Sequence, residues 1–241
     1  TGLAGVLMTA PLPARRHHLI TLDSPAWDQV LADLEPSSHA SLSLQQWQAR
    51  GWPLVVSRQP GELRHGQLQV GIPLPTDWGR QRLSLIVPQA RSLAWGCFPP
   101  AHEAQTLLLV SLAQDWLSLC QQMQAHGCTA QVYGSYGWEL ITGQGYVREG
   151  SDLDLLLPVQ CATQADRLVQ LLHAASEWPG LPRLDGELLF PDDAAIAWRE
   201  WQQWRSGASS KVMIKHTHGL RIQAHSDWPE HAPALESSHA A

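Results

Sequence analysis

The chain has 241 residues, of which 44% are hydrophobic and 16% are charged, and its formal net charge is −6. This composition is typical of a globular protein with one large core or two smaller ones, and it excludes a disordered tail or a fibrous protein. The acidic balance argues against a nucleic-acid-binding protein. No apolar run approaches the roughly 20 residues that span a bilayer. We therefore expect a cytoplasmic protein that binds neither nucleic acid nor a membrane.

The charge is distributed unevenly along the chain. Residues 1–100 carry eight basic and six acidic side chains, a net charge of +2, whereas residues 101–241 carry eight basic and sixteen acidic side chains, a net charge of −8. If the acidic part binds an anionic substrate, cations must lie between the two. The four cysteines are widely spaced without a Cys-x-x-Cys pair, so we expect reduced thiols rather than disulfides or a zinc site.

The first part of the chain, residues 14–101, is predicted to form a small α+β domain, and residues 1–13 are left out of the fold. Ser24-Pro25 indicates a helix start, because Ser caps helices and Pro suits the first helical position. The expected elements are helices at 24–34 and 43–51 and strands at 15–22, 52–58, 68–75 and 82–88.

Residues 102–228 are predicted to form a second domain. Apolar residues recur at three- and four-residue spacing from Thr106 to His126, which indicates a helix with Gly127 as its C-cap. A Gly-Ser turn and a polar loop follow the first strand of this domain. The other expected elements are strands at 129–133, 151–159 and 184–190, a helix at 162–178, a helix or strand at 195–204, and a hairpin of 211–217 and 220–225.

Asp152 and Asp154 stand at the start of the predicted strand 151–159. Side chains alternate between the two faces of a strand, so both carboxylates share one face, while Leu153 and Leu155 share the other. Carboxylates this close raise each other's pKa unless a divalent cation neutralises them. Mg²⁺ binds such oxygen ligands together with substrate phosphates. The pair therefore predicts a Mg²⁺ site that acts on a phosphate-bearing substrate.

Gly134 and Ser135 supply a second part of this predicted site. Glycine lets the backbone approach a phosphate closely, and the two amides and the serine hydroxyl can donate hydrogen bonds to phosphate oxygens. A Gly-Ser pair alone is common. At the end of one strand, followed by Ser-Asp-Leu-Asp at the start of the next, it indicates a phosphate-binding site.

This pattern, Gly-Ser followed after a spacer by Asp-x-Asp, resembles the active-site motif of the nucleotidyltransferase superfamily. The resemblance implies a mixed sheet flanked by helices and a third carboxylate on a neighbouring strand. Asp185, in the predicted strand 184–190, is the candidate for this carboxylate. Glu187, on the same face, is the alternative candidate. The simpler interpretation of Asp185 is a structural aspartate in a turn before Gly186.

A longer part of the chain, roughly residues 14–225, is similar to the phosphoribosyl-dephospho-CoA transferases that serve malonate decarboxylase as its holo-acyl-carrier-protein synthase. The most specific matches are Gly-Ser, Trp138, Leu140-x-Thr142-Gly143, Tyr146 and Ser-Asp-Leu-Asp. The similarity implies transfer of phosphoribosyl-dephospho-CoA from triphosphoribosyl-dephospho-CoA to a serine of the apo acyl-carrier-protein subunit of malonate decarboxylase, with release of pyrophosphate.

The resemblance and the chemistry of phosphoryl transfer together imply a role for each catalytic candidate. Asp152 and Asp154 would bridge two Mg²⁺ ions. Asp185 would bind the ion on the side of the nucleophile and accept the serine proton. Lys215 would supply positive charge to the phosphates, although a surface lysine on a strand is the simpler interpretation.

Three pairs of residues are expected to bind the substrate: Gly134 and Ser135 the pyrophosphate end, Arg16 and His17 the CoA phosphates or an acidic carrier protein, and Trp138 and Tyr146 the adenine. Solvated basic side chains and core packing are the alternatives for the last two pairs. The lysine that the family has after the segment 71–75 is replaced here by Arg80 or Arg82. An arginine keeps the charge but changes the phosphate-binding geometry.

Two other hypotheses are kept. The same chemistry could modify another protein, such as the citrate lyase carrier protein, or a small molecule. A non-catalytic module that binds a carrier protein is the third, but such a module would be expected to lose one of the acidic pair, and both are present. The chain has no Gly-x-Ser-x-Gly motif, P-loop or dinucleotide fingerprint, which argues against a serine hydrolase and against those nucleotide folds.

Overall fold

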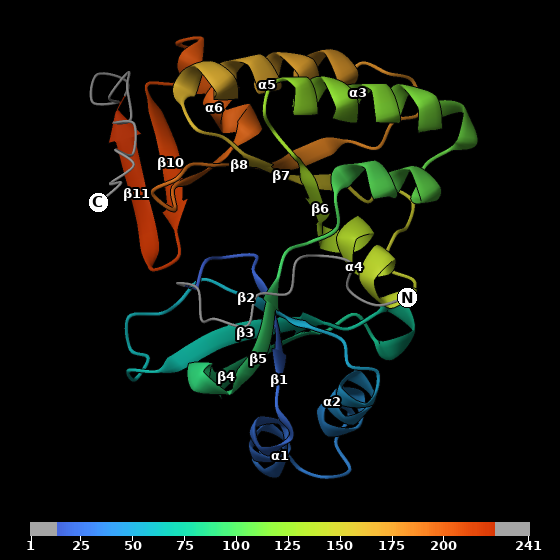
Figure 1. The fold of residues 1–241 in the computed structure, drawn as a ribbon, viewed down its shortest axis with the longest axis vertical. Coiled ribbons are helices and arrows are strands. Elements are labelled where there is room, and N and C mark those ends of the chain that lie inside the picture. The colour runs from blue at the N-terminus through green and yellow to red at the C-terminus, as the bar shows by residue number, and fades with distance from the viewer. Residues whose placement is uncertain (1–13, 225–241) are drawn as a thin grey trace, which may run out of the picture.

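The computed structural model describes residues 14–224, in which two β-sheets stand face to face and each has helices on its outer side (Figure 1). The α+β class expected from the sequence is confirmed. Residues 1–13 and residues 225–228, the end of the predicted second domain, lie outside the described residues. Within 14–224, every helix is too short or too polar to cross a membrane.

The first sheet is antiparallel throughout, with the strand order β4-β3-β2-β1-β5. The elements of this unit are β1 (Leu19–Leu22), α1 (Ser24–Ala32), α2 (His39–Ala49), β2 (Leu54–Val56), β3 (Gln67–Pro73), β4 (Arg82–Pro88) and β5 (Ser92–Gly96). β5 has no counterpart among the predicted strands. Only one of its four side chains, that of Trp95, is buried, whereas Leu93 on the same face is exposed, so the strand lacks a continuous buried face.

Both helices of this unit start differently from the prediction. The N-cap of α1 is Asp23, whose carboxylate accepts a hydrogen bond from the Ala26 amide, and Ser24 is the first helical residue. α2 begins at His39 rather than at residue 43, because the hydroxyl of Ser38 caps it. In each case the capping oxygen accepts from an amide that has no partner within the helix.

The second sheet is mixed, with the order β11-β10-β9-β8-β7-β6. Only β7 and β8 are parallel among its described pairs. The elements of this unit are α3 (Ala113–Ala125), β6 (Gln131–Tyr133), α4 (Gly134–Thr142), β7 (Leu153–Pro158), α5 (Ala162–Ala175), β8 (Leu184–Leu189), β9 (Ala195–Ala197), α6 (Trp198–Arg205), β10 (Lys211–His216) and β11 (Gly219–Ala224).

Two segments of this unit differ from the prediction. α3 is shorter, since residues 101–112 form two 3₁₀ turns, and the extended backbone at Leu108 separates the first of these from the rest. The first half of the predicted polar loop after Gly-Ser belongs to the helix α4, which buries Tyr136 and Trp138. The segment 195–204 contains both a strand, β9, and a helix, α6.

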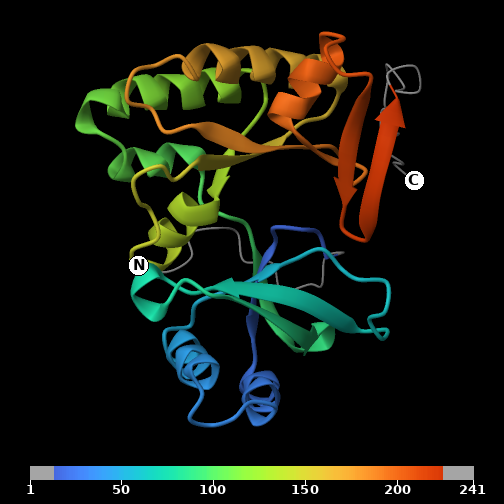
Figure 2. The ribbon, with the colours of Figure 1, turned by 180° about the vertical axis from the view of Figure 1, so that it is seen from behind.

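Alternation along β7 assigns its side chains to two different surroundings. Leu153, Leu155 and Leu157 are completely buried in the core under the outer helices α3, α5 and α6, which cover the far side of the sheet (Figure 2). Asp154 and Leu156 point the other way, toward the first sheet, and Leu156 packs into the core of the first unit. Asp154 therefore faces the space between the sheets.

Hydrogen bonds on two sides hold the sheets opposite each other. The turn between β10 and β11 reaches the first unit, where the Thr217 carbonyl accepts from the Gln59 amide at 2.7 Å and Thr217 Oγ1 accepts from the Arg16 amide at 3.2 Å. On the other side, the Tyr146 hydroxyl donates to the Pro73 carbonyl at 2.9 Å. These contacts fix the width of the space that the carboxylates face.

Gly186 lets β8 lie close to β7. It has φ +135°, and a Cβ there would overlap the carbonyl oxygen of Leu155. Gly186→Ala should lower the free energy of unfolding by about 3 kcal/mol, because backbone strain and overpacking each cost roughly 1–3 kcal/mol. Urea unfolding measures this, with Gly61→Ala as the control, since Gly61 has open space around it. Equal stabilities of the two variants would contradict the close approach.

Candidate functional site

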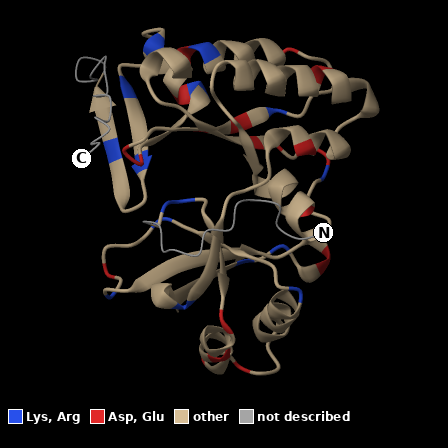
Figure 3. Ribbon diagram, viewed as in Figure 1, with Lys and Arg blue, Asp and Glu red and all other residues tan. Residues whose placement is uncertain are grey.

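Two carboxylates lie side by side on the inner face of the second sheet. In the parallel pairing of β7 and β8, Asp154 is the direct partner of Asp185, and Tyr133 of β6 is its partner on the other side. Neighbouring strands lie about 4.8 Å apart, so both carboxylates enter one small volume. Asp185 is therefore a residue within a strand rather than a turn aspartate. Figure 3 shows these acidic positions on β7 and β8, with a basic position just before β8.

Arg183 brings Asp152 into this group. Its Nη1 atom lies 2.6 Å from Asp152 Oδ2 and 3.5 Å from Asp185 Oδ2. The arginine side chain is 56% exposed, so these ion pairs are open to solvent and each is weak. Arg183 is not among the site residues predicted from the sequence. Its position two residues before Asp185 could have identified it, because alternation places both side chains on one face of a strand.

Gly134 places the start of α4 against Asp154. It is the first residue of the helix, directly after β6, with φ +62°, and a Cβ there would overlap the Asp154 carboxylate. Only glycine lets the helix begin so near this carboxylate. The amides in the first turn of a helix have no partner within it and attract anions. Gly134 and Ser135 are thus able to bind a phosphate beside Asp154.

The pKa of Asp154 reflects this crowding. Burial, followed by the charges of Asp185 and Asp152, raises it to about 7, although Arg82 and Arg183 act in the opposite direction. Such a carboxyl group is partly protonated at neutral pH, and a cation that replaces its proton is favoured.

A cavity of about 490 Å³ lies between the two sheets, and Asp154, Gly134 and Ser135 form part of its wall. Arg82 of β4 lines it from the first unit, so it is the arginine after the segment 71–75 that faces the carboxylates. Arg80 is not among the described residues that line this cavity. The volume is in the range of small-ligand sites.

Trp138 and Tyr146 line the same cavity and are also packed. Trp138 is 5% exposed and makes edge contacts with Trp47 and Phe98, at ring centroid distances of 5.5 Å for both. Tyr146 is 8% exposed and is tied to Pro73 through its hydroxyl. Both rings therefore form the wall of the cavity, where packing accounts for their positions and a base could still stack on the surface that they leave open.

Glu187 lies next to the site but has a different environment. Its carboxylate is 5% exposed and contacts Arg16 Nη2 at 3.1 Å, His17 Nε2 at 3.2 Å and Lys215 Nζ at 2.8 Å. Burial alone would raise its pKa, but the hydrogen bond and charge of His17, together with Arg16 and Lys215, lower it overall. Glu187 is thus an ionised group neutralised by its own partners, and the geometry favours Asp185 as the third carboxylate.

The cluster around Glu187 also locates three predicted substrate-binding or catalytic residues. Arg16 and Lys215 are ion-paired to it, from opposite units of the chain. His17 has φ +68°, an uncommon conformation for a histidine, and its ring packs against Tyr133 at 4.8 Å. His17 lines the cavity, whereas Arg16 and Lys215 are not among its described lining residues.

The three aspartates supply the oxygen ligands that Mg²⁺ prefers. Within residues 14–224, no three His, Cys, Asp or Glu side chains form a ready-made metal cluster, and the Arg183 guanidinium lies between Asp152 and Asp185. The oxygen donors of Asp152 and Asp185 therefore bind the Arg183 guanidinium in this structure, and the donor chemistry of the three aspartates suits Mg²⁺.

Two family models match the chain. Residues 15–92 match the phosphoribosyl-dephospho-CoA transferase MdcG N-terminal domain, and residues 101–226 match the phosphoribosyl-dephospho-CoA transferase MdcG C-terminal domain. A phosphoribosyl-dephospho-CoA transferase of Xanthomonas euvesicatoria is 37% identical over 211 residues, which cover 87% of this chain and 93% of the relative. One of Bradyrhizobium diazoefficiens is 30% identical over 217 residues, covering 86% and 91%. No solved structure matches the chain.

The raised pKa of Asp154 gives a test by pH. The folded protein binds this proton more tightly than the unfolded chain does, so its contribution to stability is full below about pH 4 and is lost as the pH rises to about 7. Asp154→Asn should therefore become progressively more stable than the unchanged protein from pH 4 to pH 7, with a constant difference above that. Urea unfolding without divalent cations at several pH values measures the difference. A pH-independent difference would contradict the shift.

The Glu187 cluster gives a test of stability. Glu187→Gln leaves Arg16 and Lys215 without their counter-charge, and breaking a buried ion pair in this way costs about 3–5 kcal/mol. The exposed pair of Arg91 and Asp23, at 3.1 Å, is the control, and Arg91→Gln should cost at most about 1 kcal/mol. Chemical unfolding of both variants at pH 7 gives the comparison. A loss for Glu187→Gln no larger than that for Arg91→Gln would show that the cluster contributes little.

Proposed function

The chain belongs to the phosphoribosyl-dephospho-CoA transferase family, and we propose that it transfers phosphoribosyl-dephospho-CoA from triphosphoribosyl-dephospho-CoA to a serine of the apo acyl-carrier-protein subunit of malonate decarboxylase, with release of pyrophosphate. The observation that supports this most strongly is the pairing of Asp154 with Asp185 beside the amino end of α4. Asp154, Gly134 and Ser135 lie together at one wall of a cavity, which supports a site for a phosphate-bearing substrate.

The residues of this wall divide the work of the proposed reaction. The amides of Gly134 and Ser135 bind the leaving pyrophosphate part of the triphosphate, and Arg82 offers positive charge from the opposite sheet. Together, these amides and Arg82 orient the phosphorus that carries the ribosyl group toward the aspartates.

Asp185 is the proposed proton acceptor. Its Oδ1 atom accepts a hydrogen bond from the Gly186 amide, and its Oδ2 atom, which lies 3.5 Å from Arg183 Nη1, would accept the proton of the incoming serine hydroxyl. The serine oxygen then forms its bond to phosphorus as the bond to the pyrophosphate oxygen breaks. Mg²⁺ held by the three aspartates would supply charge stabilisation for the phosphates and lower the pKa of the hydroxyl.

The direct test is intact-mass measurement of the apo acyl-carrier-protein subunit after incubation with triphosphoribosyl-dephospho-CoA, Mg²⁺ and this protein. We expect a mass gain equal to phosphoribosyl-dephospho-CoA on one serine, and no gain with EDTA. A gain equal to AMP, or a gain only on another carrier protein, would identify a different nucleotidyl transfer. No gain with a folded protein and an intact donor would contradict the proposed reaction.

Asp152→Asn and Asp154→Asn should each lower the transfer rate by at least about 10³-fold, because each removes a charged ligand from a site that acts by electrostatic stabilisation. Asp115→Asn is the matched control, since Asp115 is exposed on α3 outside the cavity. Circular dichroism checks that the folds are retained. Transfer by either site variant at the rate of the control would rule out the role of the carboxylate pair.

A further inference from the structure

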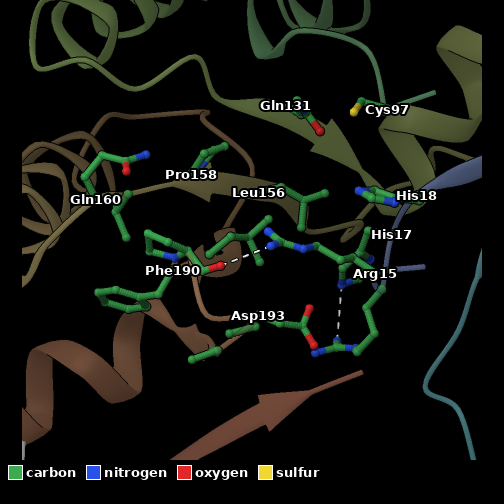
Figure 4. A pocket seen from close by; sticks show the side chains of 16 residues that line it. Arg15, His17, His18, Cys97, Gln131, Leu156, Pro158, Gln160, Phe190 and Asp193 are labelled. Carbon is green, nitrogen blue, oxygen red and sulfur yellow. Dashed lines mark hydrogen bonds between the residues drawn. The ribbon is translucent and has the colours of Figure 1, made fainter. Parts of the chain in front are cut away.

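A second cavity, of about 250 Å³, lies on the inner face of the second sheet near the carboxyl ends of β7 and β8 (Figure 4). The segment 15–18, just before β1, forms one side of it, and residues around Pro158 and Phe190 form the other. Pro158 is four residues beyond Asp154, which is roughly 13 Å along a strand. His17 lines both cavities, so the two are neighbours.

The side formed by the segment 15–18 carries hydrogen-bond donors that the protein leaves unused. Arg15 donates to the Pro191 carbonyl through Nη2 at 3.0 Å. Arg16 Nη1 and His18 Nδ1 are buried without a hydrogen-bond partner among the described residues. A buried polar atom without a partner costs about 1–3 kcal/mol, so a ligand that accepts from Arg16 Nη1 would be favoured. His18 Nδ1 donates or accepts according to the tautomer of its ring.

The charges around this side favour an anion. Asp193 is the acidic residue among the described residues that line the cavity, and its Oδ2 atom already accepts from the Thr217 amide. Arg16 and Lys215 both pair with Glu187, so these three side chains carry one net positive charge. With the charge of Arg15 added, the positive charge exceeds the negative charge of Asp193.

Apolar side chains also line the cavity, namely those of Leu156, Leu189 and Phe190, beside the polar Gln160. Figure 4 shows Phe190 on the side of the cavity away from His18, with Leu156 between them. A ligand that fits both sides has an anionic group with an alkyl group next to it.

We infer that this second cavity binds a diphosphate ester that carries a branched alkyl group beside its phosphates. The inference rests on the proposed function, under which the ligand is the dephospho-CoA part of the donor. There a diphosphate joins the adenosine to a pantoyl group with two methyl groups. The donor then lies along the inner face of the sheet, with its triphosphate at Asp154 and its diphosphate at Arg15. Free pyrophosphate shares the anionic chemistry but lacks the alkyl group.

Calorimetry with three probes tests the anionic side: S-methyl-dephospho-CoA, AMP and inorganic pyrophosphate. Arg15→Gln should weaken binding of S-methyl-dephospho-CoA by about tenfold, because it removes a charged hydrogen-bond donor. It should weaken binding of AMP less, because AMP carries only one of the two phosphates and no pantoyl group. Arg167→Gln is the control, since Arg167 is exposed on α5. An equal affinity of the Arg15 and Arg167 variants for S-methyl-dephospho-CoA would overturn the inference.

Cys97 provides an independent readout, because this exposed free thiol lines the second cavity. S-methyl-dephospho-CoA should slow alkylation of Cys97 by N-ethylmaleimide and leave the rate at Cys161 unchanged, as measured by peptide mass spectrometry. AMP should protect neither thiol. Protection of Cys97 by pyrophosphate as strong as that by S-methyl-dephospho-CoA would assign the cavity to the released product instead and overturn the inference.

The carrier-protein transfer assay, run on the same samples, separates this inference from the proposed function. Transfer from the complete donor without protection of Cys97 would reject the second cavity and keep the reaction. Protection of Cys97 without transfer to the acyl-carrier-protein subunit would keep the diphosphate site and reject the acceptor.

Discussion

The parallel pairing of β7 with β8 is the constraint on which the rest of the structure depends. It sets Asp154 beside Asp185, so that two like charges share a partly buried volume. The leucines on the opposite face of β7 keep this pairing in place, because a shift by one residue would move them out of the core and the carboxylates into it. The burial of one face thus enforces electrostatic repulsion on the other.

The protein balances acidic groups on this inner face in two ways. At Glu187, Arg16 of the first unit and Lys215 of the second unit neutralise the carboxylate within the folded chain. At Asp154, burial and the charges of Asp185 and Asp152 raise the pKa, and the charges of Arg82 and Arg183 only partly offset them. Two carboxylates on neighbouring strands therefore play opposite parts: one helps to hold the units together, and the other is left ready for a cation or a proton.

The sequence was sufficient where a local pattern has a single geometric meaning. Alternation in Ser-Asp-Leu-Asp placed the acidic pair on one face, and the spacing of apolar residues located α5 and the strands of the second sheet. It was insufficient where the outcome depends on distant contacts. β5 has no clear alternation of burial, because Leu93 is exposed although it lies on the same face as the buried Trp95. The pairing of Glu187 with Arg16 joins residues 171 positions apart, so no local pattern could show that these two charges neutralise each other.

The contacts of Thr217 and Lys215 also determine when the site can form during synthesis. Domains generally fold as units from the amino end as the chain emerges. The first sheet can assemble early, but Arg16 and His17 obtain Glu187 only after the second sheet forms, and Lys215 and the Thr217 turn come from almost the end of the described chain. The contacts that hold the two units together are therefore completed last, so a nascent chain lacks them until Thr217 has left the ribosome.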